Sequence, residues 1–169
     1  MGEKRETKMK YHFKLLLSAG ILAASMGIQT VQAAKTSITI ALQLEPPHLD
    51  PTSAAAGAID SVLYSNVFEG LTRFASDGAV IPGLAKSWEI SGDGKEYIFH
   101  LNSSVTFHDG STMDASDVKF SLDRARAEDS TNAQKALFSG IKNVEVLSSD
   151  KVKVTLASPN GSFLFNMAW

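Results

Sequence analysis

Cysteine is absent from this sequence of 169 residues. No disulfide can therefore stabilise the fold, and no thiolate is available as a nucleophile or as a metal ligand. A large excess of charge of one sign is also missing, because the formal net charge is only −2. Nucleic-acid binding usually needs a clustered basic face. No such cluster occurs after the first fourteen residues, which argues against a nucleic-acid partner.

Long apolar runs are also rare, and one of them lies near the N-terminus. Residues 15–28 (LLLSAGILAASMGI) carry no charge and follow a start that is rich in lysine and arginine. This order is typical of a secretory signal peptide. The alternative is a membrane anchor, but a spanning helix needs roughly 20 apolar residues. The sequence therefore predicts that residues 1–33 are a signal peptide.

The predicted cleavage site follows the apolar run. Val31 and Ala33 are the branched and small residues that a signal peptidase recognises, so cleavage is expected after Ala33, with Ala34 as the alternative. Met9 is an alternative start, because it gives a more usual basic region. No cysteine follows that could carry a lipid. A soluble periplasmic product is expected, rather than a lipoprotein.

The remaining residues have the composition of a globular domain. Of the whole chain, 44% is hydrophobic and 20% is charged, which is ordinary for soluble proteins. Residues 37–42 alternate polar and apolar, which predicts a strand, and a proline-rich segment at 45–51 ends it. A helix is expected over 58–68, and a short helical turn over 84–88 should lead into a strand. Further strands are predicted at 71–74, 79–81, 88–90, 96–101, 141–146 and 152–156.

The clearest helix signal begins at Asp114. This residue is a good N-cap, and Asp117 stands three residues later, where its carboxylate can reach back. Val118, Leu122 and Ala125 form the predicted buried stripe. The same capping geometry explains the two aspartates without a role as a catalytic carboxylate pair.

The order of elements predicts an α+β fold with antiparallel hairpins, because no repeating βαβ pattern is present. The last seven residues, 163–169, are strongly apolar and have neither a cap nor a polar tail. Natural termini are usually exposed and polar. The expectation is that the sequence is truncated within an element.

Six short motifs carry a resemblance to a known family. They follow one another as Glu45–Pro51, Asn66–Leu71, Pro82–Trp88, Asp93–Leu101, Val105–Gly110 and Ala115–Val118. In order and spacing they resemble family 5 of the bacterial extracellular solute-binding proteins, from about Ser37 to the last residue. One departure is Asn102–Ser104, which stands where the family often has a basic residue and a glycine.

The resemblance implies the first-lobe portion of a two-lobed periplasmic-binding-protein-like fold of class II type, with a mixed sheet and antiparallel hairpins. Residues 34–169 would be the N-terminal part of that domain. It also implies the substrate-binding component of an ABC importer, which captures dipeptides or oligopeptides and delivers them to the inner-membrane permease. Nickel, haem, glutathione or an opine are alternative ligands. The full-length protein is expected to be a monomer without a cofactor and without enzymatic activity.

The resemblance places a ligand contact at Leu44, Glu45 and Pro46. The end of this strand would face the cleft, where its backbone could pair with a bound peptide and Glu45 could meet the peptide amine. The equal alternative is a surface turn with a solvated glutamate.

Two other residue sets invite functional interpretations. The aromatic residues Trp88, Tyr97, Phe99, Phe107 and Phe120 are predicted to be core rather than a ligand-stacking box. His100, His108 and Asp109 suggest a metal site, but their spacing favours turn chemistry for the last two. A rival from another class is a periplasmic metal-dependent hydrolase that uses His48, His100 and His108. A second rival is a sensor or a chaperone-like binding protein that works without a transporter.

Overall fold

The computed structural model describes residues 36–54, 56–64 and 66–169. The chain divides into two units between Ala41 and Leu42, and the second unit holds all the described helices and strands. The predicted signal peptide and its cleavage positions, Ala33 and Ala34, lie outside the described residues. In the part that the structure describes, no helix has both the length and the apolar character needed to cross a membrane.

The strand predicted for residues 37–42 is wrong, because this segment forms no strand. The side chains of Ile38 and Ile40 are 84% and 71% exposed. A single extended segment is not stable in water without a neighbouring strand and a hydrophobic face to pack on. No strand among the described residues pairs with it. The segment therefore has the alternation of polar and apolar residues that is typical of a strand, but it does not form one.

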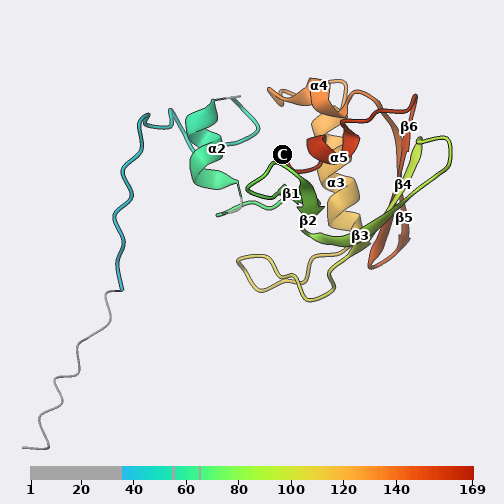
Figure 1. Ribbon diagram of the computed structural model, residues 1–169, viewed down its shortest axis with the longest axis horizontal. Coiled ribbons are helices and arrows are strands. Elements are labelled where there is room, and N and C mark those ends of the chain that lie inside the picture. The colour runs from blue at the N-terminus through green and yellow to red at the C-terminus, as the bar shows by residue number, and fades with distance from the viewer. Residues whose placement is uncertain (1–35, 55, 65) are drawn as a thin grey trace, which may run out of the picture. The chain divides into compact units, whose positions relative to one another are not determined.

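Two antiparallel sheets form the frame of the second unit (Figure 1). The smaller sheet pairs β1 (Thr72–Phe74) with β2 (Val80–Pro82). The larger one has the order β3-β4-β6-β5, with β3 at Ala85–Ile90, β4 at Glu96–Leu101, β5 at Ile141–Ser148 and β6 at Lys151–Leu156. The helices are α2 (Gly57–Leu63), α3 (Ala115–Arg126), α4 (Lys135–Phe138) and α5 (Phe163–Asn166).

This arrangement confirms the α+β class and the antiparallel hairpins. The paired strands that the structure describes all run antiparallel, so the parallel pairing of a mixed sheet is not found within them. Helix α2 is shorter than the expected 58–68, because it ends at Leu63. The apolar run at 163–169 begins with a helix, α5.

Two tight turns have the backbone conformation that their glycines allow. Gly78, in the turn between β1 and β2, has φ +84°, and Gly94, between β3 and β4, has φ +68°. Side chains with a Cβ rarely adopt such angles. In the first turn the carboxylate of Asp77 also accepts a hydrogen bond from the N–H of Ala79 at 3.0 Å. The two turns connect antiparallel hairpins, as the order of elements predicted.

Strand β3 corrects the helical turn that was expected at 84–88. The strand begins at Ala85, which is opposite Leu101, and its register shifts between Ala85 and Ser87. An irregularity of this kind adds a residue to one strand and breaks the alternation of buried and exposed side chains. The pattern that would reveal the strand is therefore missing from the sequence, and the pairing with β4 decides the conformation.

The core lies where α3 packs against the larger sheet through β5 and β6 (Figure 1). Strand β4 contributes Tyr97, Phe99 and Leu101 from one face, as its alternation predicted, and all three are buried. Helix α3 contributes the predicted stripe, Val118, Leu122 and Ala125. Burial of such apolar area is the main source of stability, at about 25 cal/mol per Å².

Two of the five aromatic residues expected in the core lie elsewhere. Trp88 is half-buried against Phe99, but Phe107 is 46% exposed and Phe120 is 66% exposed. Phe120 lies on the side of α3 that does not contact the sheet. The prediction was wrong for these two residues, because an apolar side chain on the edge of a helix stripe is buried only if a further layer covers it.

The start of α3 has the predicted capping box. The carboxylate of Asp114 accepts a hydrogen bond from the N–H of Ser116 at 2.6 Å, and that of Asp117 accepts one from the N–H of Asp114 at 2.9 Å. These bonds satisfy backbone donors that have no partner within the helix. The two aspartates therefore have a structural role at the start of the helix.

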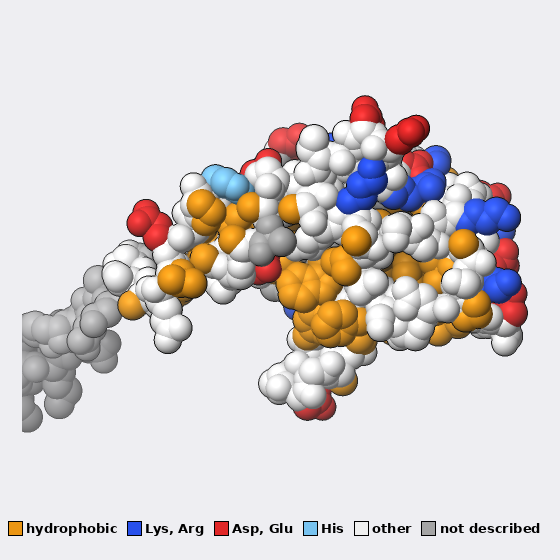
Figure 2. All heavy atoms as spheres, turned by 90° about the horizontal axis from the view of Figure 1, so that it is seen from above, with side chains coloured by type: hydrophobic (Ala, Val, Ile, Leu, Met, Phe, Trp, Pro, Cys, Tyr) orange, Lys and Arg blue, Asp and Glu red, His pale blue; other side chains and the backbone are white. Residues whose placement is uncertain are grey.

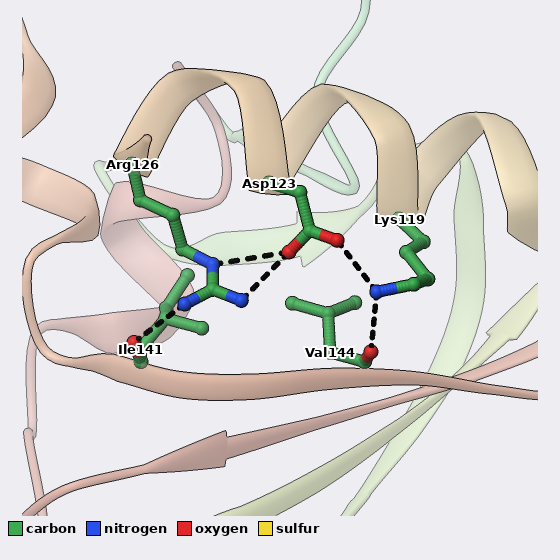
Figure 3. Close-up of polar contacts among 5 residues, drawn as sticks. All are labelled: Lys119, Asp123, Arg126, Ile141 and Val144. Carbon is green, nitrogen blue, oxygen red and sulfur yellow. Dashed lines mark hydrogen bonds and ion pairs between the residues drawn. The ribbon is translucent and has the colours of Figure 1, made fainter. Parts of the chain in front are cut away.

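A charged network joins the middle of α3 to β5 (Figure 3). Asp123 pairs with Lys119 and with Arg126, whose Nη2 lies 2.7 Å from the carboxylate. The same cations donate to the carbonyls of Val144 and Ile141, at 3.0 and 3.3 Å. Burial acts to raise the pKa of Asp123, but hydrogen bonds from Lys119 and Arg126 outweigh it, so the pKa is lowered.

The Asp123→Asn substitution should therefore change how stability depends on pH. Because the folded pKa is depressed, ionised Asp123 stabilises the fold above its unfolded pKa of about 3.9, and this contribution is lost as the pH falls through the folded value. The side chain is about a third exposed, so solvent screening limits the loss at pH 7 to about 1 kcal/mol. The difference from the unmodified chain should shrink below about pH 4.

Urea unfolding at pH 7, 5 and 3 measures this effect. The control is Asp129→Asn, since Asp129 is an exposed carboxylate for which the structure shows no ion pair with any described residue. A penalty for Asp123→Asn that stays constant from pH 7 to pH 3 would contradict the role given to the ionised carboxylate.

Candidate functional site

The predicted ligand-contact residues lie on an exposed, irregular segment near the start of the second unit. Leu44 is 71% exposed, Glu45 is exposed and Pro46 is half-buried. No hydrogen bond joins the backbone of residues 42–49 to the backbone of another described residue. An extended segment with free N–H and C=O groups can add to a peptide as a neighbouring strand does.

The turn that follows this segment is held by its own side chains. The carboxylate of Asp50 accepts hydrogen bonds from Oγ1 of Thr52 at 2.7 Å and from its N–H at 2.8 Å. These bonds lower the pKa of Asp50. The turn therefore fixes the direction of the chain at Pro51 and Thr52. A hydrogen bond from the N–H of Ala133 to the carbonyl of Thr52, at 3.0 Å, holds this part of the chain further.

His48 is the first of the three histidines in the metal-dependent hydrolase alternative, and both its ring nitrogens contact residues of its own turn. Its Nδ1 accepts from the N–H of Asp50 at 3.2 Å, and its Nε2 lies 3.3 Å from Oγ of Ser53. A neutral imidazole with an accepting Nδ1 carries its proton on Nε2. In that tautomer Nε2 donates to the hydroxyl of Ser53 rather than accepting from it. The pair does not have the arrangement of a serine nucleophile with its base.

The other histidines lie on separate elements. Nε2 of His100, on β4, is 2.7 Å from the carboxylate of Glu89 on β3. His108 lies in the turn with Asp109, whose carboxylate accepts from the hydroxyl and the N–H of Ser111 at 2.6 and 2.9 Å. Turn chemistry is therefore confirmed for Asp109, and these bonds lower its pKa. Within the described ranges, no group of three histidine or carboxylate residues is placed to hold a metal ion.

A groove beside α3 is the feature that the sequence did not predict. It consists of two adjoining hollows of about 420 and 500 Å³, which share residues from four separated segments of the chain. The shared lining residues are Phe68, Glu69, Gly70, Ser121, Leu122, Phe138 and Trp169. We call this surface the α3 groove. Figure 2 shows hydrophobic side chains gathered on one face of the molecule.

The α3 groove is mainly apolar, but charged side chains border it too: Glu69 lines both hollows, and Arg124 and Asp129 line the second. Leu71, Leu84, Val105, Met113 and Val118 line its first hollow. Asp117 borders it as well, but its carboxylate already caps α3. Pro51 and Thr52 line the second hollow, so the groove adjoins the exit of the predicted ligand segment. Leu44, Glu45 and Pro46 themselves do not line it.

This fold and these motifs correspond to a known class of proteins. Residues 79–168 match the family model described as bacterial extracellular solute-binding proteins, family 5 Middle. The chain therefore belongs to family 5 of the bacterial extracellular solute-binding proteins, which confirms the resemblance carried by the six motifs. The observed fold is a partial version of the periplasmic-binding-protein fold.

Individual relatives are longer than this chain. A glutathione-binding protein of Pectobacterium atrosepticum is 37% identical over 153 residues, which is 90% of this chain and 29% of the relative. A di/tripeptide-binding protein of Pseudomonas aeruginosa is 30% identical over 88% of this chain and 31% of its own length. The crystal structure of NikZ from Campylobacter jejuni with Ni(L-His) has a TM-score of 0.66 at 35% identity, and covers 74% of this chain and 25% of that chain.

Proposed function

We propose that this chain is the exported N-terminal part of a periplasmic binding protein that captures a peptide or a similar solute for an ABC importer. Membership of the solute-binding family supports ligand capture rather than catalysis. Two relatives are named for glutathione and for di- and tripeptides. In this proposal the signal peptide, residues 1–33, is cleaved off after Ala33, with cleavage after Ala34 as the alternative. The mature protein is a soluble monomer that docks on the membrane permease.

The exposed segment with a free backbone carries the proposal for the site. An extended peptide would pair with the backbone beside Leu44 and Pro46, and the carboxylate of Glu45 would accept from its terminal ammonium group. Main-chain pairing recognises any sequence, so it suits a receptor for many peptides. A hydrogen bond to a charged group contributes about 1.5–3 kcal/mol when it is shielded from water.

The Glu45→Gln substitution should weaken the binding of a peptide with a free amine by about tenfold, which corresponds to about 1.4 kcal/mol. The measurement is isothermal titration calorimetry with a tripeptide. It uses the complete product, meaning the longer binding protein of which this chain is proposed to be the N-terminal part. The control ligand is the same tripeptide with an acetylated amine, whose affinity should be nearly unchanged by the substitution. Equal losses for the two peptides would contradict the contact between Glu45 and the amine.

A solute screen tests the function itself. The complete product is heated with separate panels of di- and tripeptides, glutathione, nickel–histidine, haem and opines. A ligand at 100 times its dissociation constant should stabilise the folded state by about 2.7 kcal/mol, which is seen as a higher melting temperature. The proposal fails if no panel raises it. Release of free amino acids from the peptides would instead indicate a hydrolase.

Residues 34–169 alone should bind the same solute at least a hundredfold more weakly than the complete product. The chain spans less than a third of the two relatives, and in a two-lobed protein the ligand contacts both lobes. The same titration measures both forms. Equal affinity of the two forms would show that the site lies wholly within this chain.

A further inference from the structure

Strand β5 lies at one edge of the larger sheet, where the strand order is β3-β4-β6-β5. Its register against β6 shifts at both ends but is regular from Asn143 to Val146. Val146 and Leu147 are also 38% and 44% exposed. An edge strand with free backbone groups and exposed apolar side chains is a template for pairing with another strand. A protein that stays monomeric in solution therefore has to block such an edge.

The backbone of Val144 points to this free edge. In an antiparallel ladder, opposite residues alternate between exchanging two hydrogen bonds and exchanging none, so residues two apart point the same way. The N–H of Leu156 donates to the carbonyl of Lys95, on the β4 side of β6, at 2.8 Å. Val154 therefore also points to β4, and it is opposite Val144. It follows that Val144 and Val146 make no ladder bond to β6 and direct their N–H and C=O groups outward.

Two cations of α3 occupy carbonyls at this edge (Figure 3). Nζ of Lys119 donates to the carbonyl of Val144 at 3.0 Å, and Nη1 of Arg126 donates to that of Ile141 at 3.3 Å. A paired strand would place its own N–H groups at a similar distance from such oxygens, about 2.9–3.0 Å. The two cationic groups therefore stand where the backbone of an added strand would lie.

Asp123 holds both cations in place. Its carboxylate accepts from Nζ of Lys119 and from Nε and Nη2 of Arg126. The three residues are spaced by four and three positions, so they lie on one face of α3. Their side chains are 26–42% exposed, so they are packed at the edge of the sheet rather than free in solvent. The outward groups of Val146 have no such contact with a side chain of the described residues.

A second copy of this chain is the strand that fits the edge. Antiparallel pairing of two β5 strands about a twofold axis at Glu145 would place Val144 of each copy opposite Val146 of the other. Pairs of β-branched side chains stabilise neighbouring strands. Glu145 would face the same residue of the other copy, but Lys153 lies 3.2 Å from its carboxylate and offsets the like charges. The strand is therefore self-complementary once the two cations are removed.

We infer that Lys119 and Arg126, held by Asp123, close the edge of β5 to a second copy and so keep the protein monomeric. The inference uses the monomeric state of the proposed function but does not depend on its solute. A purely structural role for the same contacts, in which they only join α3 to β5, would change stability without changing the oligomeric state. The oligomeric state therefore separates the two roles.

The triple substitution Lys119→Met, Asp123→Asn and Arg126→Met tests the inference in the complete product. It removes both cations without leaving an unpaired carboxylate, and methionine is a good helix former. Sedimentation velocity should detect dimers at a protein concentration at least tenfold below that at which the unmodified product forms them. Pairing engages the outward N–H groups, so the amide of Val146 should exchange with deuterium at least tenfold more slowly in this variant.

Two further variants are the controls. Lys86→Met, Lys95→Met and Glu128→Gln together remove the same charges from side chains that make no ion pair with other described residues, and this variant should stay monomeric. Val146→Pro, added to the triple substitution, should restore the monomer. Proline removes an outward N–H but no ladder bond to β6.

A folded triple variant that remains as monomeric as the unmodified product would overturn the inference. Self-association that persists with Val146→Pro would also overturn it, because it would arise at another surface. Slow exchange at Val146 in the unmodified monomer would do the same, since it would show that further chain covers the edge.

If the triple variant does not fold, Lys119→Met alone keeps the inference testable, because it leaves Asp123 paired with Arg126. It should lower the concentration at which dimers form at least threefold, and an unchanged value would overturn the inference. The solute screen is independent of these results. A monomer that dimerises on loss of the cations but binds no solute would refute the proposed function and support the closed edge.

Discussion

The Phe99→Ala substitution should lower the free energy of unfolding of the chain by about 3–5 kcal/mol, as truncation of a fully buried phenylalanine usually does. The Phe99 side chain is 0% exposed. Its ring lies within 6.2–6.5 Å of the rings of Phe163, Tyr97 and Trp88, measured between centroids. Loss of the ring leaves a cavity between β4 and α5 that rigid strands cannot close. Urea unfolding followed by circular dichroism measures the change.

The matched control is the same change at Phe120, which is 66% exposed. Little apolar area is lost there, and alanine favours the helix, so the cost in this chain should be below about 1 kcal/mol. A similar cost at the two positions would show that Phe99 does not lie in the core described above. If the Phe99 variant is unfolded without urea while the Phe120 variant is folded, the difference stands.

The Gly70→Ala substitution should be the second most damaging change, at about 3 kcal/mol, the upper end of the usual cost of overpacking. A Cβ on Gly70 would lie 2.6 Å from the carbonyl oxygen of Met167 and 2.8 Å from Cα of Ala168. Both are backbone atoms, so no side chain can turn aside. The segment after α5 must shift, and Trp169 should lose its packing against Tyr64.

Two measurements check this result. Urea unfolding gives the loss of stability, and tryptophan emission should move to longer wavelength as Trp169 becomes more hydrated. Gly92→Ala is the control, because a Cβ there meets no atom within 4 Å and its φ lies outside the left-handed region. That substitution should stabilise the chain slightly, by about 0.4–1 kcal/mol. A stable Gly70 variant with unchanged emission would mean that the contact is looser than described.

The sequence predicted those parts of the fold whose causes are local. The turn at Gly78 follows from the glycine and the aspartate before it, and the start of α3 follows from Asp114 and Asp117. The buried face of β4 follows from strict alternation of its side chains. In each case the deciding interactions join residues that are close in the chain, so pattern and structure agree.

The missed features depend on residues far apart in the chain. Strand β3 is set by its pairing with β4, and its bulge removes the alternation that would have revealed it. Residues 37–42 have the reverse problem, since they have the pattern but no described partner. The α3 groove joins segments around residues 68, 121, 138 and 169, and no motif signals that these segments lie together. Leu44, Glu45 and Pro46 could be predicted only through the family resemblance, and their role remains a proposal.

The strand order of the larger sheet has a consequence for how the chain folds. Strands β3 and β4 form one hairpin and β5 and β6 another, but the sheet is completed only when β4 pairs with β6, which lies more than fifty residues further along. At 5–20 residues per second, a ribosome produces β6 roughly 3–11 s after β4. During that interval one edge of β4 has no partner strand, and Phe163, whose ring packs on Tyr97 and Phe99, has not yet been synthesised. The first hairpin therefore stays open to chaperones or to aggregation until the second one has been synthesised.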